Sequence, residues 1–135
     1  MQRITHRLFG IGIALIVTKI FNIDPVYSLI SGLSANLPDI DTPKSKVGRI
    51  FPKISISLNN NFRHRGITHS LLGCFITAGT FFLILTILFH INLISALILY
   101  KLTLFFIIGY LSHILSDSLT ITGLPIFYPL ERKYS

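Results

Sequence analysis

An uncharged stretch from Ser70 to Tyr100 constrains the fold of this chain more than any other feature. It contains no Asp, Glu, Lys or Arg. A core strand needs only about 4–8 apolar residues, whereas about 20 in a helix span the hydrocarbon core of a bilayer. Across its 135 residues the chain is 51% hydrophobic and 13% charged. A soluble domain of this size has too little interior to bury so much apolar surface. We therefore expect one integral-membrane domain over residues 1–135.

Breaks in the apolar pattern divide the chain into four expected helices. Proline and polar residues supply the breaks, at Asp24-Pro25, at the pair Pro38 and Pro43, and at His90-Ile91-Asn92. The expected helices cover residues 4–21, 25–37, 67–89 and 93–117. At about 1.5 Å per residue the last two can cross a bilayer, the first barely can, and the second is too short. The fold class is thus an all-α polytopic bundle of about four helices, with one polar loop over residues 38–65.

The basic residues gather on one side of this topology. If the helices alternate in direction, the N-terminus, the 38–65 loop and the C-terminal tail share a side. Ten of the 12 Lys and Arg residues then lie there: Arg3, Arg7, Lys44, Lys46, Arg49, Lys53, Arg63, Arg65, Arg132 and Lys133. The positive-inside rule places both termini and the loop in the cytoplasm. Topology thus accounts for the net charge of +7, which favours contact with anionic membrane lipids rather than nucleic acid.

Histidines and aspartates gather on the same side. They open the first and third helices, follow the second and close the fourth: His6, Asp39, Asp41, His64, His69, His113 and Asp117. His90 and Asp24 are the exceptions, in turns on the opposite side. Ionisable groups at membrane depth are costly and are functional candidates by default. Individually, each residue has a plainer interpretation as an interfacial hydrogen-bonding or turn residue, but those interpretations leave the shared side unexplained.

The local spacings favour convergence of these side chains. His113 and Asp117 are separated by four residues and share a helix face. Pro38 and Pro43 favour an extended segment between them, in which Asp39 and Asp41 would point the same way. Further along, Gly66 allows a turn between the two histidines of the FRHRGITHS stretch, and Thr68 is the expected cap of the next helix.

Four imidazoles and three carboxylates form a mixed nitrogen and oxygen ligand set. With one cysteine in the chain and none in the set, this chemistry suits Zn, with Mn or Fe as alternatives, in one or two ions bridged by an aspartate. A bound ion activates water and stabilises a developing oxyanion. Arg65 and its basic neighbours would bind phosphate oxygens, and Asp39 or Asp41 would act as general base where it is not a ligand. A lipid-linked phosphoester is the expected substrate.

Four sequence pieces give the chain a recognisable resemblance. They are THR at 5–7, LPDIDTPKSKVGR at 37–49, FRHRGITHS at 62–70 and GYLSHILSDSLTITG at 109–123. In order and spacing they resemble the YdjM-like family of bacterial inner-membrane proteins, described as metal-dependent hydrolases. The resemblance implies a multi-pass protein of the bacterial inner membrane that binds metal at the seven residues named above. A looser similarity to zinc-dependent phospholipase C enzymes supports only the substrate class.

Two alternatives to a hydrolase remain open at this point. One is a non-enzymatic scaffold or regulatory protein in which a structural metal ties the helices together. The other is a proton-coupled or ion-coupled transporter, although its pathway would need polar groups near the midplane. Many members of the resembled family continue with further hydrophobic segments. Residues 118–135 are therefore expected to act either as a lid or as a tail, and a homo-oligomer is one way to cover an open flank.

Overall fold

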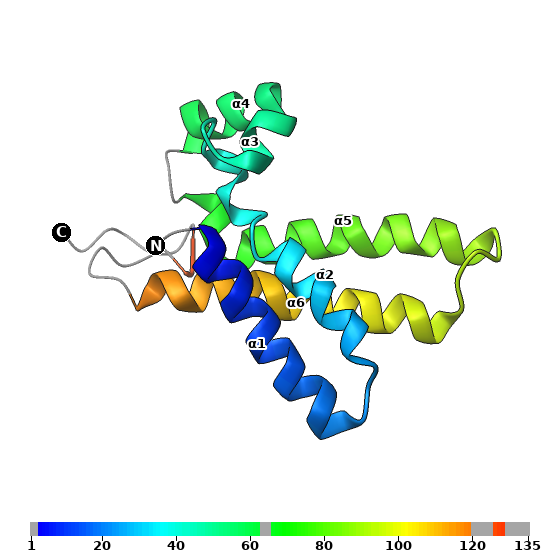
Figure 1. Cartoon of the computed structure of the whole chain (residues 1–135). Coiled ribbons are helices and arrows are strands. Elements are labelled where there is room, and N and C mark those ends of the chain that lie inside the picture. The colour runs from blue at the N-terminus through cyan, green and yellow to red at the C-terminus, as the bar shows by residue number, and fades with distance from the viewer. Residues whose placement is uncertain (1–2, 63–65, 120–125, 129–135) are drawn as a thin grey trace.

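The computed structural model of the chain describes residues 3–62, 66–119 and 126–128. All regular elements in these ranges are helices, which confirms the expected fold class (Figure 1). In chain order they are α1 (Arg3–Phe21), η1 (Pro25–Tyr27), α2 (Ser28–Ser34), η2 (Pro38–Asp41), α3 (Lys46–Ile50), α4 (Pro52–Phe62), η3 (Ile67–His69), α5 (Leu71–His90) and α6 (Ala96–Ser118).

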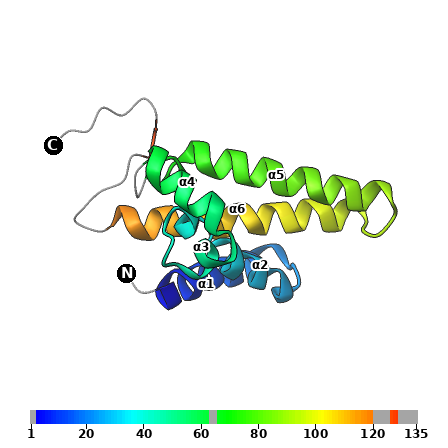
Figure 2. The same ribbon diagram turned by 90° about the horizontal axis from the view of Figure 1, so that it is seen from above.

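Three of these helices, α1, α5 and α6, are long and apolar enough to cross a membrane. Large side chains on them point outward, including Ile16, Phe75 and Ile87, as expected for surfaces that contact lipid. α5 and α6 lie alongside each other, and α1 and α2 pack across α6 (Figures 1 and 2). The protein is thus a multi-pass helical bundle whose apolar helices contact membrane lipids.

The segment expected to be a polar loop contains three helical elements within its described part, η2, α3 and α4. Pro38 occupies the first turn of η2, where its fixed φ suits a helix and its missing N–H costs nothing. Ser45 then caps α3, because its Oγ accepts a hydrogen bond from the Gly48 N–H at 2.8 Å. Short local caps therefore organise a stretch whose polarity suggested irregular structure.

Thr42, which precedes Pro43, is extended as expected (φ −104, ψ 105), but the prediction is wrong for the residues before it, because Pro38–Asp41 form the 3₁₀ helix η2. Leu37 is helical, with φ −66 and ψ −37, although a residue before proline usually avoids that region. Its carbonyl accepts from Ile40 N at 2.9 Å, while its own N–H donates to Ser34 O at 3.0 Å. These bonds continue the end of α2 into η2. The expected helix cap also moves by two residues, since Ser70 rather than Thr68 accepts from Gly73 N and caps α5.

Small residues hold the short helix α2 against α6. The Ser31 hydroxyl donates to the carbonyl oxygen of Phe105 at 2.6 Å. Opposite it, a Cβ on Gly109 would overlap the Ser31 carbonyl oxygen and the Ser34 hydroxyl. Close backbone approach at small residues is the usual way for helices to associate in membranes. This contact places the end of α2, and hence η2, beside the last turns of α6.

We predict that Gly109→Ala destabilises the bundle by about 1–3 kcal/mol, the usual cost of overpacking a closely packed core. Gly79→Ala is the matched control, because a Cβ at Gly79 in α5 meets no atom within 4 Å. The two variants are compared with wild type by thermal unfolding in one detergent. Equal unfolding temperatures for all three proteins would contradict the close α2–α6 packing.

Candidate metal centre

Six of the seven sequence-predicted ligands lie together at one end of the bundle. His6 comes from α1, Asp39 and Asp41 from η2, His69 from η3, and His113 and Asp117 from α6. Five of them are at most 4% exposed, whereas the Asp39 side chain is 22% exposed. The seventh, His64, lies outside the described residues, as do Arg63 and Arg65. The structure thus assembles four distant segments into one polar cluster, while the role of its members as ligands stays a prediction.

His113 is oriented by the backbone at the end of α2. Its Nδ1 lies 2.7 Å from the carbonyl oxygen of Ala35. A carbonyl oxygen can only accept, so Nδ1 carries the proton, and Nε2 presents a lone pair when the ring is neutral. That Nε2 lies 3.6 Å from Oδ2 of Asp117, one turn further along α6. The backbone bond therefore sets both the tautomer of His113 and the direction of its free nitrogen.

His69 is oriented in the same way by a hydroxyl and a carboxylate. The Thr68 hydroxyl donates to Oδ2 of Asp41 at 2.8 Å, which leaves its lone pairs to accept from His69 Nδ1 at 3.1 Å. The same Asp41 oxygen lies 3.4 Å from that Nδ1. Tyr110 in turn donates to the Thr68 carbonyl at 2.6 Å and ties η3 to α6. Nδ1 of His69 is thus the protonated nitrogen, and Nε2 faces the centre of the cluster.

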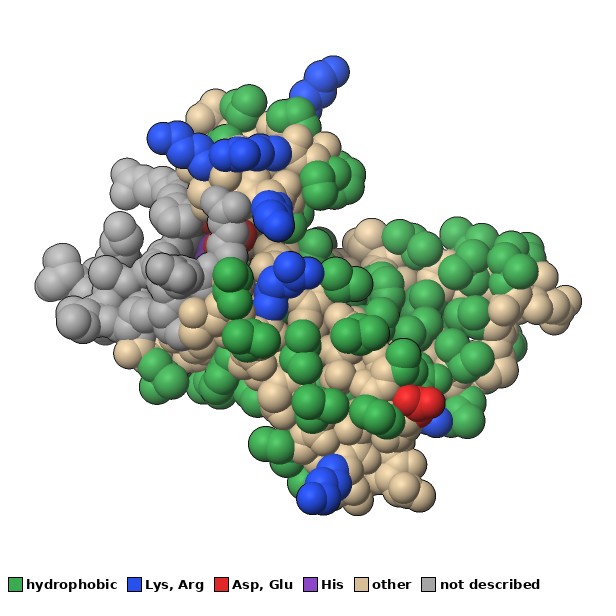
Figure 3. All heavy atoms as spheres, viewed as in Figure 1, with side chains coloured by type: hydrophobic (Ala, Val, Ile, Leu, Met, Phe, Trp, Pro, Cys, Tyr) green, Lys and Arg blue, Asp and Glu red, His purple; other side chains and the backbone are tan. Residues whose placement is uncertain are grey.

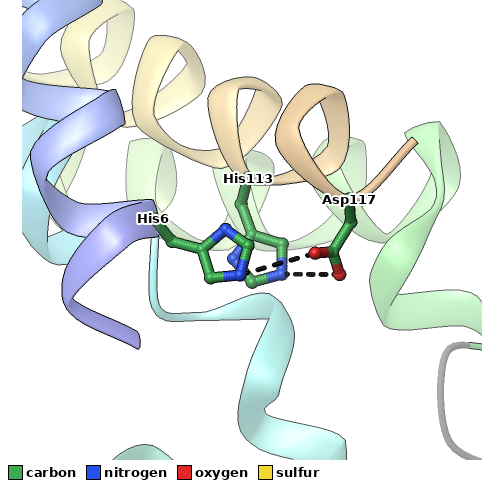
Figure 4. Close-up of side chains that lie close together, drawn as sticks. All are labelled: His6, His113 and Asp117. Carbon is green, nitrogen blue, oxygen red and sulfur yellow. Dashed lines mark ion pairs between the residues drawn. The ribbon is translucent and has the colours of Figure 1, made fainter. Parts of the chain in front are cut away.

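His6 repeats the arrangement from the third side. The Ser116 hydroxyl donates to the carbonyl oxygen of His113 at 2.9 Å, so it accepts from Nδ1 of His6 at 2.6 Å. Nε2 of His6 then faces Oδ1 of Asp117 at 3.4 Å. The His6 and His113 rings stack with centroids 4.1 Å apart, and both point toward Asp117 (Figure 4).

The centre of the cluster therefore brings imidazole nitrogens and carboxylate oxygens close together. The Nε2 atoms of His69 and His113 are 3.3 Å apart. Oδ2 of Asp117 lies 3.8 Å from the first of these nitrogens, and Oδ1 of Asp39 lies 3.9 Å from it. Lone pairs and carboxylates that face one another repel unless a cation lies among them.

These residues fit a divalent metal ion. Two imidazole nitrogens bound at about 2.0–2.1 Å to one tetrahedral zinc ion lie about 3.3 Å apart. The separation between His69 and His113 is 3.3 Å. Moreover, each histidine donates its other nitrogen to an oxygen, as metal-bound histidines almost always do. The set of imidazole and carboxylate groups suits Zn, Mn or Fe.

In two overlapping triads, His6–His113–Asp117 and Asp39–His69–His113, one potential ligand atom from each residue lies within 4.8 Å of the others. They share His113, whose single available nitrogen can bind only one ion. Asp117 directs Oδ1 toward His6 and Oδ2 toward His113. The residues of both triads would hold one ion together, or two ions with Asp117 close to both.

Asp41 occupies a different place from the other carboxylates. It approaches Nδ1 of His69, on the side of the ring away from Asp39 and Asp117. The 3₁₀ turn separates Asp39 and Asp41, which an extended segment would have aimed together. Sequence reasoning also missed the orienting groups Ala35, Thr68 and Ser116. Thr68 adjoins His69 in the sequence, but Ser116 is 110 positions from His6, and a backbone carbonyl such as that of Ala35 leaves no sequence signal.

Comparison with known proteins agrees with the membrane architecture. The family described as "YdjM inner membrane protein" matches residues 1–135. The chain is 38% identical over 104 residues to inner membrane protein YdjM of Escherichia coli (strain K12), which covers 76% of this chain and 48% of that protein. A protein of the same name from Shigella flexneri matches equally well. The chain thus spans about half the length of these two relatives.

A third relative covers more of the chain. It is the uncharacterized protein YvsG of Bacillus subtilis (strain 168), 33% identical over 126 residues, which are 93% of this chain and 71% of that protein. No solved structure matches the chain significantly. The match to the family over residues 1–135, with three helices capable of crossing a membrane, shows that this chain belongs to the YdjM family of inner membrane proteins.

Proposed function

We propose that the protein is a membrane-embedded, metal-dependent hydrolase that acts on a phosphoester of a lipid-linked substrate at the cytoplasmic face. One observation carries the proposal. Three histidines have Nδ1 committed to oxygen acceptors, and their Nε2 atoms converge with the carboxylates of Asp39 and Asp117. This arrangement is preorganised for a divalent ion.

The exposure of Asp39 supports a catalytic rather than a closed structural site. The other five described side chains are buried, and Asp39 is the one with 22% of its side chain exposed. Catalytic metal sites keep one coordination position accessible to water or substrate, whereas structural sites are closed by protein ligands. Within the described residues, the side that carries Asp39 is therefore the entrance.

The residues divide into holding, orienting and proton-transfer roles. His69, His113 and Asp117 would hold the ion, with His6 or Asp39 completing the set. When bound, a divalent ion supplies activation of water and stabilisation of negative charge on the reacting oxygen. Asp39, where it is not a ligand, accepts a proton at the entrance, while Asp41 and Thr68 keep His69 in the correct tautomer. Binding of substrate phosphate by Arg65 stays a prediction from the sequence.

The distribution of cations supports a site on the cytoplasmic side. Lys44, Lys46, Arg49 and Lys53 lie in or beside α3 and α4, which pack on the η2 segment that carries Asp39. Lys19, in contrast, is in the last turn of α1. Nζ of Lys101 lies 5.5 Å from the ring centroid of Tyr27, which belongs to η1 at the other end of α2. The positive-inside rule then orients the metal-site end toward the cytoplasm.

A scaffold with a structural metal is the second candidate, and the deep burial of five of the six residues favours it. The transporter alternative has less support. Along α5 the hydroxyls of Thr77, Thr80 and Thr86 bond back to carbonyls of their own helix, at 2.8–2.9 Å. They are therefore not displayed along a polar path across the membrane.

We predict that the purified protein binds one or two equivalents of Zn, Mn or Fe per chain, and that His113→Ala and Asp117→Ala each abolish this binding. His90→Ala is the matched control, since His90 is an exposed histidine at the opposite end of α5. Elemental analysis of detergent-purified protein measures the content. Absence of metal from the wild type, even after incubation with Zn²⁺, would contradict the proposal.

We predict that Asp41→Asn keeps the metal stoichiometry but weakens affinity about 10–100-fold, the usual effect of losing a partner that orients a ligand. Competition with a chelator measures the affinity, and ¹⁵N NMR reports the tautomer of His69. Asp24→Asn is the control, because Asp24 caps η1 away from the cluster. Complete loss of stoichiometric binding in Asp41→Asn would instead make Asp41 a ligand.

We predict that the zinc-loaded protein hydrolyses bis(p-nitrophenyl) phosphate or phosphatidic acid in mixed micelles, with no activity in His113→Ala. Asp39→Asn should lower kcat about 10²–10⁴-fold, as expected for loss of a general base. His90→Ala should match the wild type. A protein that holds its metal but turns over neither compound would favour the structural-metal candidate.

A further inference from the structure

A basic lobe formed by residues 44–62 is not explained by the metal centre. It comprises α3, α4 and the residues that flank α3. Its four cations, Lys44, Lys46, Arg49 and Lys53, are all exposed. Moreover, the chain has no acidic residue between Asp41 and Asp117. Residues 44–62 therefore carry four cations and no carboxylate in their sequence.

The same lobe exposes large apolar side chains and buries small ones. Its outer surface includes Ile50, Phe51, Ile54, Ile56 and Phe62, each at least 40% exposed. Inside, Ser55 is fully buried, and a Cβ on Gly48 would overlap the Thr42 carbonyl. Because α4 has only 11 residues, it is too short to cross a bilayer, which takes about 20. The exposed apolar groups thus belong neither to a folded core nor to a spanning helix.

The position of the lobe indicates what covers these groups. It lies at the end of the bundle where α5 begins and projects to the side of the α5–α6 pair (Figures 1 and 2). If α5 and α6 cross the membrane along their length, a sideways projection at their end lies in the plane of the membrane surface. Figure 3 shows basic side chains over the lobe, with hydrophobic ones along the edge nearest α5.

The lobe is held in this position by hydrogen bonds at its base. The Ser45 hydroxyl donates to the Asp39 carbonyl oxygen at 2.8 Å and accepts from Gly48 N at 2.8 Å. It therefore joins the first turn of α3 to η2, which itself continues from α2. The lobe is consequently a fixed extension of the bundle.

We propose that the lobe is an interfacial anchor that binds anionic phospholipid headgroups. Its Lys and Arg side chains contact headgroup phosphates, while Phe51 and Ile54 enter the boundary between headgroups and acyl chains. Interfacial helices combine a basic polar face with an apolar face in this manner. A nucleic acid or an acidic protein would account for the cations, but a membrane surface accounts for the cations and the exposed apolar residues together. The inference is independent of whether the protein binds metal.

A fluorescence experiment tests the anchor directly, because the chain contains no tryptophan. Ile54→Trp and Asn60→Trp each introduce a single reporter at an exposed position of α4. The full chain is placed in nanodiscs of phosphatidylcholine with brominated acyl chains, with or without phosphatidylglycerol. We expect strong quenching and a blue shift for the Ile54→Trp variant, increased by phosphatidylglycerol, and little quenching for Asn60→Trp. Equally weak quenching of both reporters would overturn the proposal.

The charge requirement is tested in the Ile54→Trp background. Substitution of Lys44, Lys46, Arg49 and Lys53 by Gln should remove the effect of phosphatidylglycerol. Each cation near an anionic membrane surface increases the affinity for that surface about fivefold. Lys19→Gln with Lys101→Gln is the matched control and should keep the effect. If the quenching is unchanged both by adding phosphatidylglycerol and by removing the four cations, the assignment to anionic lipid is overturned. Cross-linking of Ile54→Cys between chains would overturn it in favour of a second copy.

Discussion

The contact between α2 and α6 is the constraint on which the rest of the structure depends. The Ser31 hydroxyl donates to the Phe105 carbonyl. Gly109, which lacks a Cβ, leaves room for the α2 backbone. His113 hydrogen-bonds to the Ala35 carbonyl. A helix of seven residues has little stability of its own. Held against α6, however, it delivers η2 to the cluster and determines the tautomer of His113. The same small-residue contact thus supports the bundle and orders the candidate metal centre.

The cost of burying ionisable groups explains why the polar residues occur together. An isolated carboxylate or imidazolium in an apolar bundle is strongly unfavourable unless it is paired or coordinates a metal. Here each buried histidine donates from Nδ1 to an oxygen, which belongs to Ser116 for His6, to the adjacent Thr68 for His69 and to Ala35 for His113. The remaining nitrogens share one small volume with Asp39 and Asp117. A divalent cation, as proposed, would be bound by these nitrogens and carboxylates together.

The candidate metal centre and the basic lobe are connected through η2. Asp39 belongs to the centre, while its carbonyl oxygen accepts the Ser45 hydroxyl at the base of the lobe. A lobe seated on anionic headgroups would therefore hold the more exposed side of the centre at the membrane surface. This arrangement is consistent with a lipid-linked substrate that approaches from the plane of the bilayer rather than from solution.

Hydrophobicity and charge in the sequence by themselves determined the fold class, the three long apolar helices and the grouping of His6, Asp39, Asp41, His69, His113 and Asp117 at one end. These properties follow from the membrane environment, because the bilayer core favours apolar helices and disfavours isolated charges. Only the tertiary structure decided which nitrogen of each histidine faces inward, that Asp41 lies behind His69, and that residues 46–50 and 52–62 are helical. Those features depend on groups from distant segments, such as the Ala35 carbonyl beside His113 and the Asp41 carboxylate beside Thr68 and His69. Their hydrogen bonds exist only after the helices have packed, and local spacing along the chain does not encode them.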